Sequence, residues 1–295
     1  MENENYKKPL IIAEIGCNHK GDFDIAKELI DLAVESDADY AKFQKRNPRE
    51  LLSKEQYDAP HPNIYHAYGD TYGEHRENLE FSLEQHTELL EYCKLKHIGY
   101  STSVWDISSA NEIISLEPDY IKIPSACNTN YHLLEILRDN YQGDIHISLG
   151  MTTRKEEAEI IEFMKIKPGT LDRVILYSCT SGYPVPFEDV ALLEIKRIKN
   201  TYGHLIKDIG FSGHHLGIAI DNAAYTLGAN IIERHFTKDR TWRGTDHAAS
   251  LEPQGLKKLV RDLHATYHSL SYKSNEILEI EDVQRNKLKY KGIQK

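Results

Sequence analysis

The sequence predicts a (β/α)8 TIM barrel. Three observations support this fold: short apolar runs alternate with amphipathic windows, eight such pairs follow one another, and 295 residues suit one barrel domain. A doubly wound open sheet is the alternative. We expect the barrel over residues 1–270 and a polar helical tail over residues 271–295.

Eight short runs are predicted to be strands because they are apolar, rich in β-branched residues and bounded by turn-forming residues. In chain order they are Leu10–Ile15, Asp39–Phe43, Gly99–Ser103, Asp119–Ile123, Asp144–Leu149, Val174–Ser178, Ile209–Ser212 and Asn230–His235.

The windows between these runs have helical periodicity. In the first, Ile25, Leu29, Leu32 and Ala33 mark one apolar face, which is the spacing that a barrel-covering helix needs. The predicted helices are Asp22–Ser36, Leu83–Lys96, Ser108–Leu116, Tyr131–Asn140, Arg154–Lys165, Phe187–Asn200, Gly217–Leu227 and Pro253–His268.

One connection, Lys45 to Asn78, is much longer than the others. It contains three prolines and several tyrosines and histidines. A loop of this length in a compact domain is usually a lid, a binding loop or a disordered segment, and its aromatic residues favour an ordered cover.

The stretch Ile209 to His247 suggests a metal site. Its strand–helix–strand pattern places two parallel strands side by side, so that His214 and His235 emerge at the same sheet edge. Neutral imidazoles suit divalent Mn, Fe, Co or Zn, and two protein ligands leave room for water or substrate. The alternative is that each histidine caps a strand or packs in the interior.

The other strand ends carry two lysines and five hydroxyl groups. Ammonium groups supply charge and hydroxyls supply directed hydrogen bonds, so together they would hold a small substrate with a phosphate and a carboxylate. The alternative is that the lysines pair with Glu14 or Glu233 as structural ion pairs. The residues concerned are Lys42, Thr102, Lys122, Ser125, Ser148, Ser181 and Ser212.

Composition excludes several classes of function. A formal net charge of −10 argues against nucleic acid or an anionic membrane as the main partner. The four cysteines form no CxxC pair, and no signal peptide or membrane-spanning run is visible, so we expect a cytoplasmic protein. No GxSxG, GxxxxGK[ST] or GxGxxG motif supports a serine hydrolase, a P-loop or a dinucleotide-binding site.

The sequence resembles the sialic acid synthases, which condense phosphoenolpyruvate with an N-acetylhexosamine aldehyde. The matching segments occur in family order and span Leu10 to about Gln254. They are IIAEIGCNHKGDFDIAKELIDLA, YAKFQK, YSTSVWD, YIKIPSACN, ISLGMTT, YSCTSGYPVPFEDV, GFSGHH, IIERHFT and RGTDHAASLEP. The resemblance implies carbohydrate biosynthesis, as for a capsule or other surface polysaccharide, and a homodimer.

The resemblance also implies roles for individual residues. His214 and His235 would bind a divalent metal, typically manganese, with magnesium or cobalt as alternatives. The metal would polarise the aldehyde, and the enol carbon of phosphoenolpyruvate would attack it. Glu14 and Gln44 would lie near the metal and the acceptor sugar, and Glu14 is the candidate for proton transfer. The residues that would hold phosphoenolpyruvate are Lys42, Thr102, Lys122, Ser125, Ser148, Ser181 and Ser212, while Asp246 would lie beside the sugar and Tyr183 would wall the pocket.

Two departures from the family pattern concern the acceptor. Cys127 stands where these synthases generally have an acidic residue, and a thiol cannot accept hydrogen bonds as a carboxylate does. The sequence also ends after a stretch that resembles only the linker to the family's C-terminal antifreeze-like domain, so we expect that domain to be lacking.

Three alternatives follow. One is a synthase of a different 3-deoxy-ulosonate, with an acceptor that is phosphorylated or lacks the N-acetyl group. The others are a metal-dependent barrel isomerase or hydrolase, and a non-catalytic relative.

Overall fold

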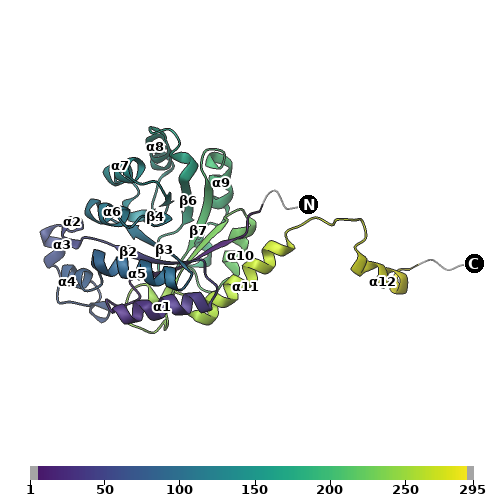
Figure 1. Cartoon of the computed structure of the whole chain (residues 1–295), viewed down its shortest axis with the longest axis horizontal. Coiled ribbons are helices and arrows are strands. Elements are labelled where there is room, and N and C mark those ends of the chain that lie inside the picture. The colour runs from purple at the N-terminus through teal and green to yellow at the C-terminus, as the bar shows by residue number, and fades with distance from the viewer. Residues whose placement is uncertain (1–5, 291–295) are drawn as a thin grey trace, which may run out of the picture.

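The predicted barrel is confirmed. The computed structural model, described here for residues 6–290, has eight parallel strands that close into a barrel in sequence order, each paired with the next and β8 paired with β1 (Figure 1). The strands are β1 Leu10–Gly16, β2 Tyr40–Lys45, β3 Gly99–Val104, β4 Tyr120–Ile123, β5 Asp144–Ser148, β6 Val174–Cys179, β7 Asp208–Gly213 and β8 Ile231–His235.

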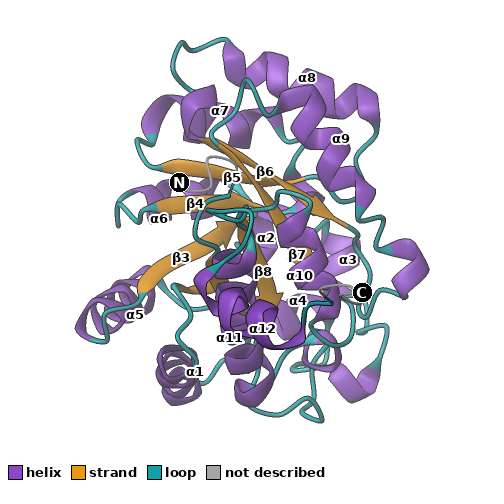
Figure 2. Cartoon of the chain, turned by 90° about the vertical axis from the view of Figure 1, so that its right-hand side faces the viewer, coloured by secondary structure: helices purple, strands orange, loops and turns teal. Residues whose placement is uncertain are grey.

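Helices surround this barrel and cover its outer face (Figure 2). One main helix follows each strand. In chain order these helices are α1 Phe23–Glu35, α5 Leu83–Leu95, α6 Ile107–Ile114, α7 Tyr131–Asn140, α8 Arg154–Lys165, α9 Leu193–Tyr202, α10 Ala219–Thr226 and α11 Pro253–Ser269.

Alternation along the strands explains where the polar site lies. Ile12, Tyr120 and Ile231 belong to an apolar layer inside the barrel. Because side chains on a strand alternate between faces, the residues two positions later also point inward, one layer nearer the carboxyl ends. Those residues are Glu14, Lys122 and Glu233. The apolar layer therefore forms the floor under a charged layer.

The buried face of α1 differs slightly from the predicted one. Leu29 and Ala33 are fully buried as expected, but Ala26 and Ile30 are buried with them, while Ile25 and Leu32 are only partly covered. The helix is thus rotated toward the barrel, and the small Ala26 and Ala33 side chains allow its close approach.

The helix predicted at Phe187–Asn200 is in fact two elements. A 3-10 turn, η4, covers Phe187–Asp189, and α9 begins only at Leu193. Ala191 between them has a φ of 52°, a left-handed conformation that no α-helix contains. The hydrophobic pattern alone does not reveal this break.

The long connection between β2 and α5 is ordered, as predicted. It contains α2 Pro48–Leu51, α3 Lys54–Asp58, η1 Ile64–His66 and α4 Tyr72–Glu77. The Tyr68 hydroxyl donates a hydrogen bond to the carbonyl of Arg243, and the Gly244 amide donates to His66 at 3.2 Å. The segment is therefore fastened to the connection that follows β8.

The last described helix, α12 Glu279–Leu288, has no buried residue and lies away from the barrel (Figure 1). The predicted tail therefore contains a helix, while residues 291–295 lie outside the described part of the chain. None of the helices within residues 6–290 has the length and apolar character that a bilayer crossing requires.

Candidate active site

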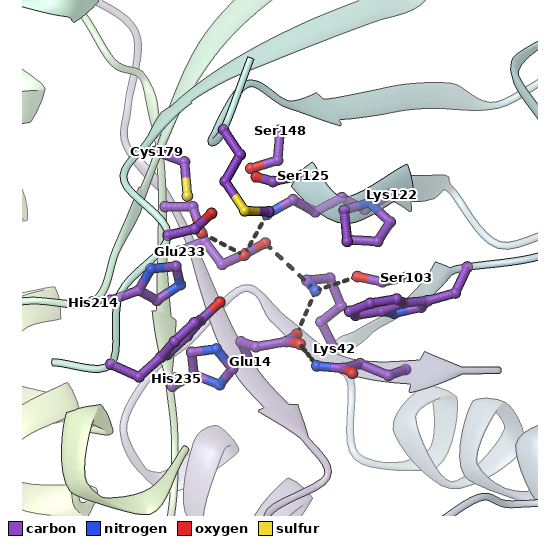
Figure 3. Close-up of a pocket in the computed structure, with 18 residues that line it drawn as sticks. Glu14, Lys42, Ser103, Lys122, Ser125, Ser148, Cys179, His214, Glu233 and His235 are labelled. Atoms are coloured by element: carbon purple, nitrogen blue, oxygen red, sulfur yellow. Dashed lines mark hydrogen bonds and ion pairs between the residues drawn. The ribbon is translucent and has the colours of Figure 1, made fainter. Parts of the chain in front are cut away.

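A cavity of about 320 Å³ opens at the carboxyl ends of the strands, where TIM barrels place their chemistry (Figure 3). Most of the predicted site residues meet in it, although they come from all parts of the sequence. Those that line it are Glu14, Lys42, Gln44, Lys122, Ser125, Ser148, Ser181, Tyr183, Ser212, His214 and His235.

Two lysines and two glutamates form a buried network across the floor of this cavity (Figure 3). Lys122 donates to Glu233 at 2.5 Å, and Lys42 pairs with Glu14 and lies 3.7 Å from Glu233. All four side chains are at most 5 % exposed. Burying charges is costly unless each has a partner, so the ion pairs explain how two lysines can lie inside a barrel.

The two glutamates of this network titrate differently. Burial raises the pKa of Glu14 to about 7, although the adjacent Lys42 opposes the shift. Glu233 is also buried, but Lys122 and Lys42 outweigh burial and hold its pKa well below the usual range. Glu233 is therefore the permanent anion, and Glu14 is the carboxyl group that can exchange a proton near neutral pH.

Hydroxyl groups converge on the wall made by β4, β5 and β6. The Gly150 amide donates to the Ser125 hydroxyl at 3.0 Å. A Cβ atom at Gly150 would lie 2.5 Å from the Ser181 hydroxyl and 2.6 Å from that of Ser125. Only a glycine lets these two hydroxyls approach each other, which forms a small polar cradle beside Ser148 and Lys122.

His214 and His235 lie side by side on the opposite wall, with their ring centroids 5.4 Å apart (Figure 3). Nδ1 of His214 lies 3.0 Å from the Thr180 carbonyl, so Nε2 is the ring nitrogen that would bind a metal. Within the described part of the chain, the buried Nδ1 of His235 has no hydrogen-bond partner. Burial lowers the pKa of His235 to about 4, with Asp246 opposing, so this ring is neutral at pH 7.

These features fit the predicted metal ligands. Among residues 6–290, no group of three or more His, Cys, Asp or Glu side chains is arranged around a metal position. Two histidines would therefore need water or substrate to complete the coordination shell.

A buried cluster behind the histidines fixes their backbone. The Arg234 guanidinium donates to Asp221 at 2.6 Å, to the His215 carbonyl at 2.6 Å and to the Gly217 carbonyl at 2.8 Å. Arg234 directly precedes His235. The segment to which it donates, His215 to Gly217, begins directly after His214. One side chain thus ties the two candidate ligands to each other.

Two predicted residues do not line the cavity. Thr102 is fully buried on the same face of β3 as Tyr100, which packs between strands and helices, so its hydroxyl points away from the cavity. Ser103 lines the cavity instead and accepts a hydrogen bond from Lys42 at 2.9 Å. Asp246 is half-buried, and its carboxylate accepts from Thr245 at 3.0 Å.

Other lining residues were not among the predicted site residues. Ser103, Trp105, Cys179 and Glu233 also line the cavity. Strict alternation from Ser101 would have identified Ser103, and the same rule applied from Tyr177 gives Cys179. Trp105 follows the end of β3, and no sequence pattern reveals its direction.

Cys127, the position that departs from the family pattern, lies in a neighbouring cavity. That cavity has a volume of about 190 Å³ and shares Trp105 with the first. Burial raises the pKa of the Cys127 thiol to about 12, so it is neutral.

Known proteins resemble this chain over most of its length. It is 37% identical to human N-acetylneuraminate-9-phosphate synthase over 281 residues, which is 94% of this chain and 76% of that protein. It is 37% identical to N,N'-diacetyllegionaminic acid synthase of Campylobacter jejuni over 254 residues, or 86% of this chain and 75% of the relative.

A solved structure, the N-acetylneuraminic acid synthetase of Leptospira borgpetersenii in complex with citrate, superposes with a TM-score of 0.79. The two sequences are 30% identical, and the superposition covers 97% of this chain and 94% of the solved one. The sequence pattern of the NeuB family matches residues 29–275. Sequence, fold and the composition of the cavity agree, and this chain belongs to the NeuB family.

Proposed function

We propose that this protein is an enzyme that condenses phosphoenolpyruvate with a sugar aldehyde to give a nonulosonic acid and phosphate. The observation that carries the proposal is the pair of buried lysines at the barrel mouth, surrounded by serine hydroxyls. The named relatives are synthases of sialic and legionaminic acids, which supports the same class of product.

The cavity offers separate groups for the two anionic ends of phosphoenolpyruvate. Lys122 with Ser125, Ser148 and Ser181 suits one end, and Lys42 with Ser103 suits the other. Each lysine already faces a glutamate, so with Glu14 ionised the charges of Lys42, Lys122, Glu14 and Glu233 sum to zero. An incoming phosphate therefore needs further positive charge.

A divalent cation would supply that charge. The unpartnered Nδ1 of His235 and the oriented ring of His214 are suitable ligands, and manganese is our first expectation, followed by magnesium or cobalt. When bound, such an ion acts as a Lewis acid toward the aldehyde oxygen.

The remaining steps use residues of the chain. The enol carbon forms a bond to the aldehyde carbon, and the aldehyde oxygen takes up a proton. Water adds at C2 and gives up one proton. Cleavage of the bond between C2 and the phosphate oxygen then releases phosphate, and loss of the proton from the C2 hydroxyl leaves the ketone. Lys42 and Lys122 stabilise the charged species from fixed positions. Glu14 is placed to transfer a proton because its pKa is raised to about 7 and Gln44 donates to it at 3.2 Å. We further propose a cytoplasmic homodimer, with Tyr183 and Asp246 beside the acceptor.

Phosphate release tests this function. Purified protein is incubated with phosphoenolpyruvate, manganese and a panel of N-acetylmannosamine, its 6-phosphate, mannose and arabinose 5-phosphate. We expect chelator-sensitive release with one of these sugars, a ketoacid product of the summed carbon skeleton, and a rate at least a hundredfold lower in Lys122→Met.

Phosphoenolpyruvate binding is measured by calorimetry in parallel. Absence of binding, or phosphate release that is independent of any sugar, would contradict the proposed function.

A further inference from the structure

The neighbouring cavity adjoins the candidate active site. Trp105 and Ala126 line both, so the two cavities meet at these residues. The second cavity, of about 190 Å³, has room for several water molecules. It lies at the base of the long ordered segment, which contributes Arg46, Leu51, Leu52 and Arg76 to its wall.

This cavity has a surplus of positive charge. Of the residues that the structure describes, two arginines line it and no acidic residue does. Arg46 is compensated, because its Nε lies 2.5 Å from the Glu80 carboxylate. Arg76 has no carboxylate partner within residues 6–290 and donates only to the Tyr72 hydroxyl, at 3.2 and 2.7 Å. Among the lining residues and their ion-pair partners, two guanidinium groups face one carboxylate, which leaves one positive charge.

The other walls make that charge effective. Leu51, Leu52 and the neutral Cys127 thiol contribute no charge. Trp105 lies beneath both guanidinium groups, with its ring centroid 5.6 Å from Arg46 and 5.7 Å from Arg76, so stacking holds them toward the cavity. A charge among apolar walls is poorly screened and interacts strongly with an anion.

We propose that this second cavity binds a phosphate ester on the acceptor sugar, at the end remote from the aldehyde. The inference rests on the proposed function, which puts the aldehyde carbon in the first cavity. A phosphate dianion can accept hydrogen bonds from the Arg76 N–H groups that do not donate to Tyr72, whereas a sugar hydroxyl leaves the charge of Arg76 without a counterion. The phosphorylated sugar is then the preferred acceptor.

The first test compares N-acetylmannosamine with its 6-phosphate in steady-state kinetics. We expect kcat/KM at least tenfold higher for the phosphorylated sugar in the natural protein. Arg76→Gln lowers that value about tenfold to a hundredfold, which is the range for one charged hydrogen-bond partner, and changes the value for the neutral sugar less than twofold. Arg49→Gln is the matched control, because Arg49 is 70% exposed, is paired with Glu77 and does not line the cavity.

A second variant tests the same site by charge rather than by deletion. Cys127→Asp places a carboxylate in the cavity, where it repels the phosphate and neutralises the surplus charge. We expect weaker binding of the sugar phosphate by at least tenfold in calorimetry, while Cys127→Ser, which is neutral, stays within threefold.

The outcomes separate the two proposals. Equal or better use of the neutral sugar by the natural protein overturns this inference, and so does an unchanged preference in both Arg76→Gln and Cys127→Asp. Condensation with neutral sugars in that case leaves the proposed function intact. If phosphoenolpyruvate neither binds nor reacts, both proposals fail together.

Discussion

Glu233 is the residue on which the charges of the site converge. It accepts from Lys122 at 2.5 Å and from the Ser212 hydroxyl at 2.9 Å, and it lies 3.7 Å from Lys42. The sequence allows two interpretations of the lysines, as an anion-binding cradle or as members of structural ion pairs. The structure shows the ion pairs, and these pairs keep the lysines charged and in place, which a cradle also requires.

A double-mutant cycle measures the strength of this arrangement. Lys122→Met leaves Glu233 buried with one cation fewer, and we expect it to lower the free energy of unfolding by about 3 kcal/mol. Adding Glu233→Gln removes the uncompensated charge, so the double variant should lose at least about 1 kcal/mol less than the sum of the two single variants. Urea unfolding followed by circular dichroism gives all four values. Strict additivity would show that the two residues do not interact.

At the scale of elements, a histidine links α5 to the barrel. His86 on α5 is fully buried, and its Nδ1 lies 2.7 Å from the Tyr100 hydroxyl on β3. Burial lowers the pKa of His86 to about 3. The contact therefore requires the neutral ring, and the packing of this helix depends on pH.

The sign of that dependence follows from proton linkage. An unfolded histidine titrates near 6.5, so between about pH 6.5 and 3 the unfolded state binds the extra proton and the free energy of unfolding falls as the pH decreases. His86→Gln keeps a partner for Tyr100 but cannot titrate. The stability of the variant relative to the natural protein should therefore be higher at pH 4.5 than at pH 7, by about 2.5 kcal/mol.

Urea unfolding at the two pH values gives this difference. His268→Gln is the control, because His268 is exposed on α11. The same relative change in both variants would contradict a specific role for His86.

At the scale of the whole molecule, the closed barrel and α12 are independent in packing. The hydrophobic core is built from strands and helices between residues 10 and 270, and α12 contributes no buried residue to it. Ile280, Val283 and Leu288 on α12 are all exposed.

Removal of residues 271–295 tests this independence. We expect the melting temperature of the barrel to change by less than about 2 °C, because no apolar area of α12 is buried against it. Differential scanning calorimetry of the two proteins gives the comparison. A decrease of 5 °C or more would mean that this segment packs on the barrel.

Local sequence was sufficient for the fold and for most of the site. Eight β-rich runs, the spacing of the helices and the position of polar residues at strand ends identified the barrel, because these signals depend on short-range periodicity and on the parallel topology. Lys42, Lys122, His214 and His235 therefore met where they were expected.

Only the tertiary structure decided which face each side chain presents and which residues from distant strands become partners. Thr102 and Ser103 are neighbours in sequence, yet a single step along β3 separates the helix layer from the cavity. A second cavity is lined by Arg46, Arg76 and Trp105. These residues meet because the long segment between β2 and α5 packs back against the barrel. Such contacts are determined by packing between segments that are distant in sequence, so the local sequence pattern does not predict them.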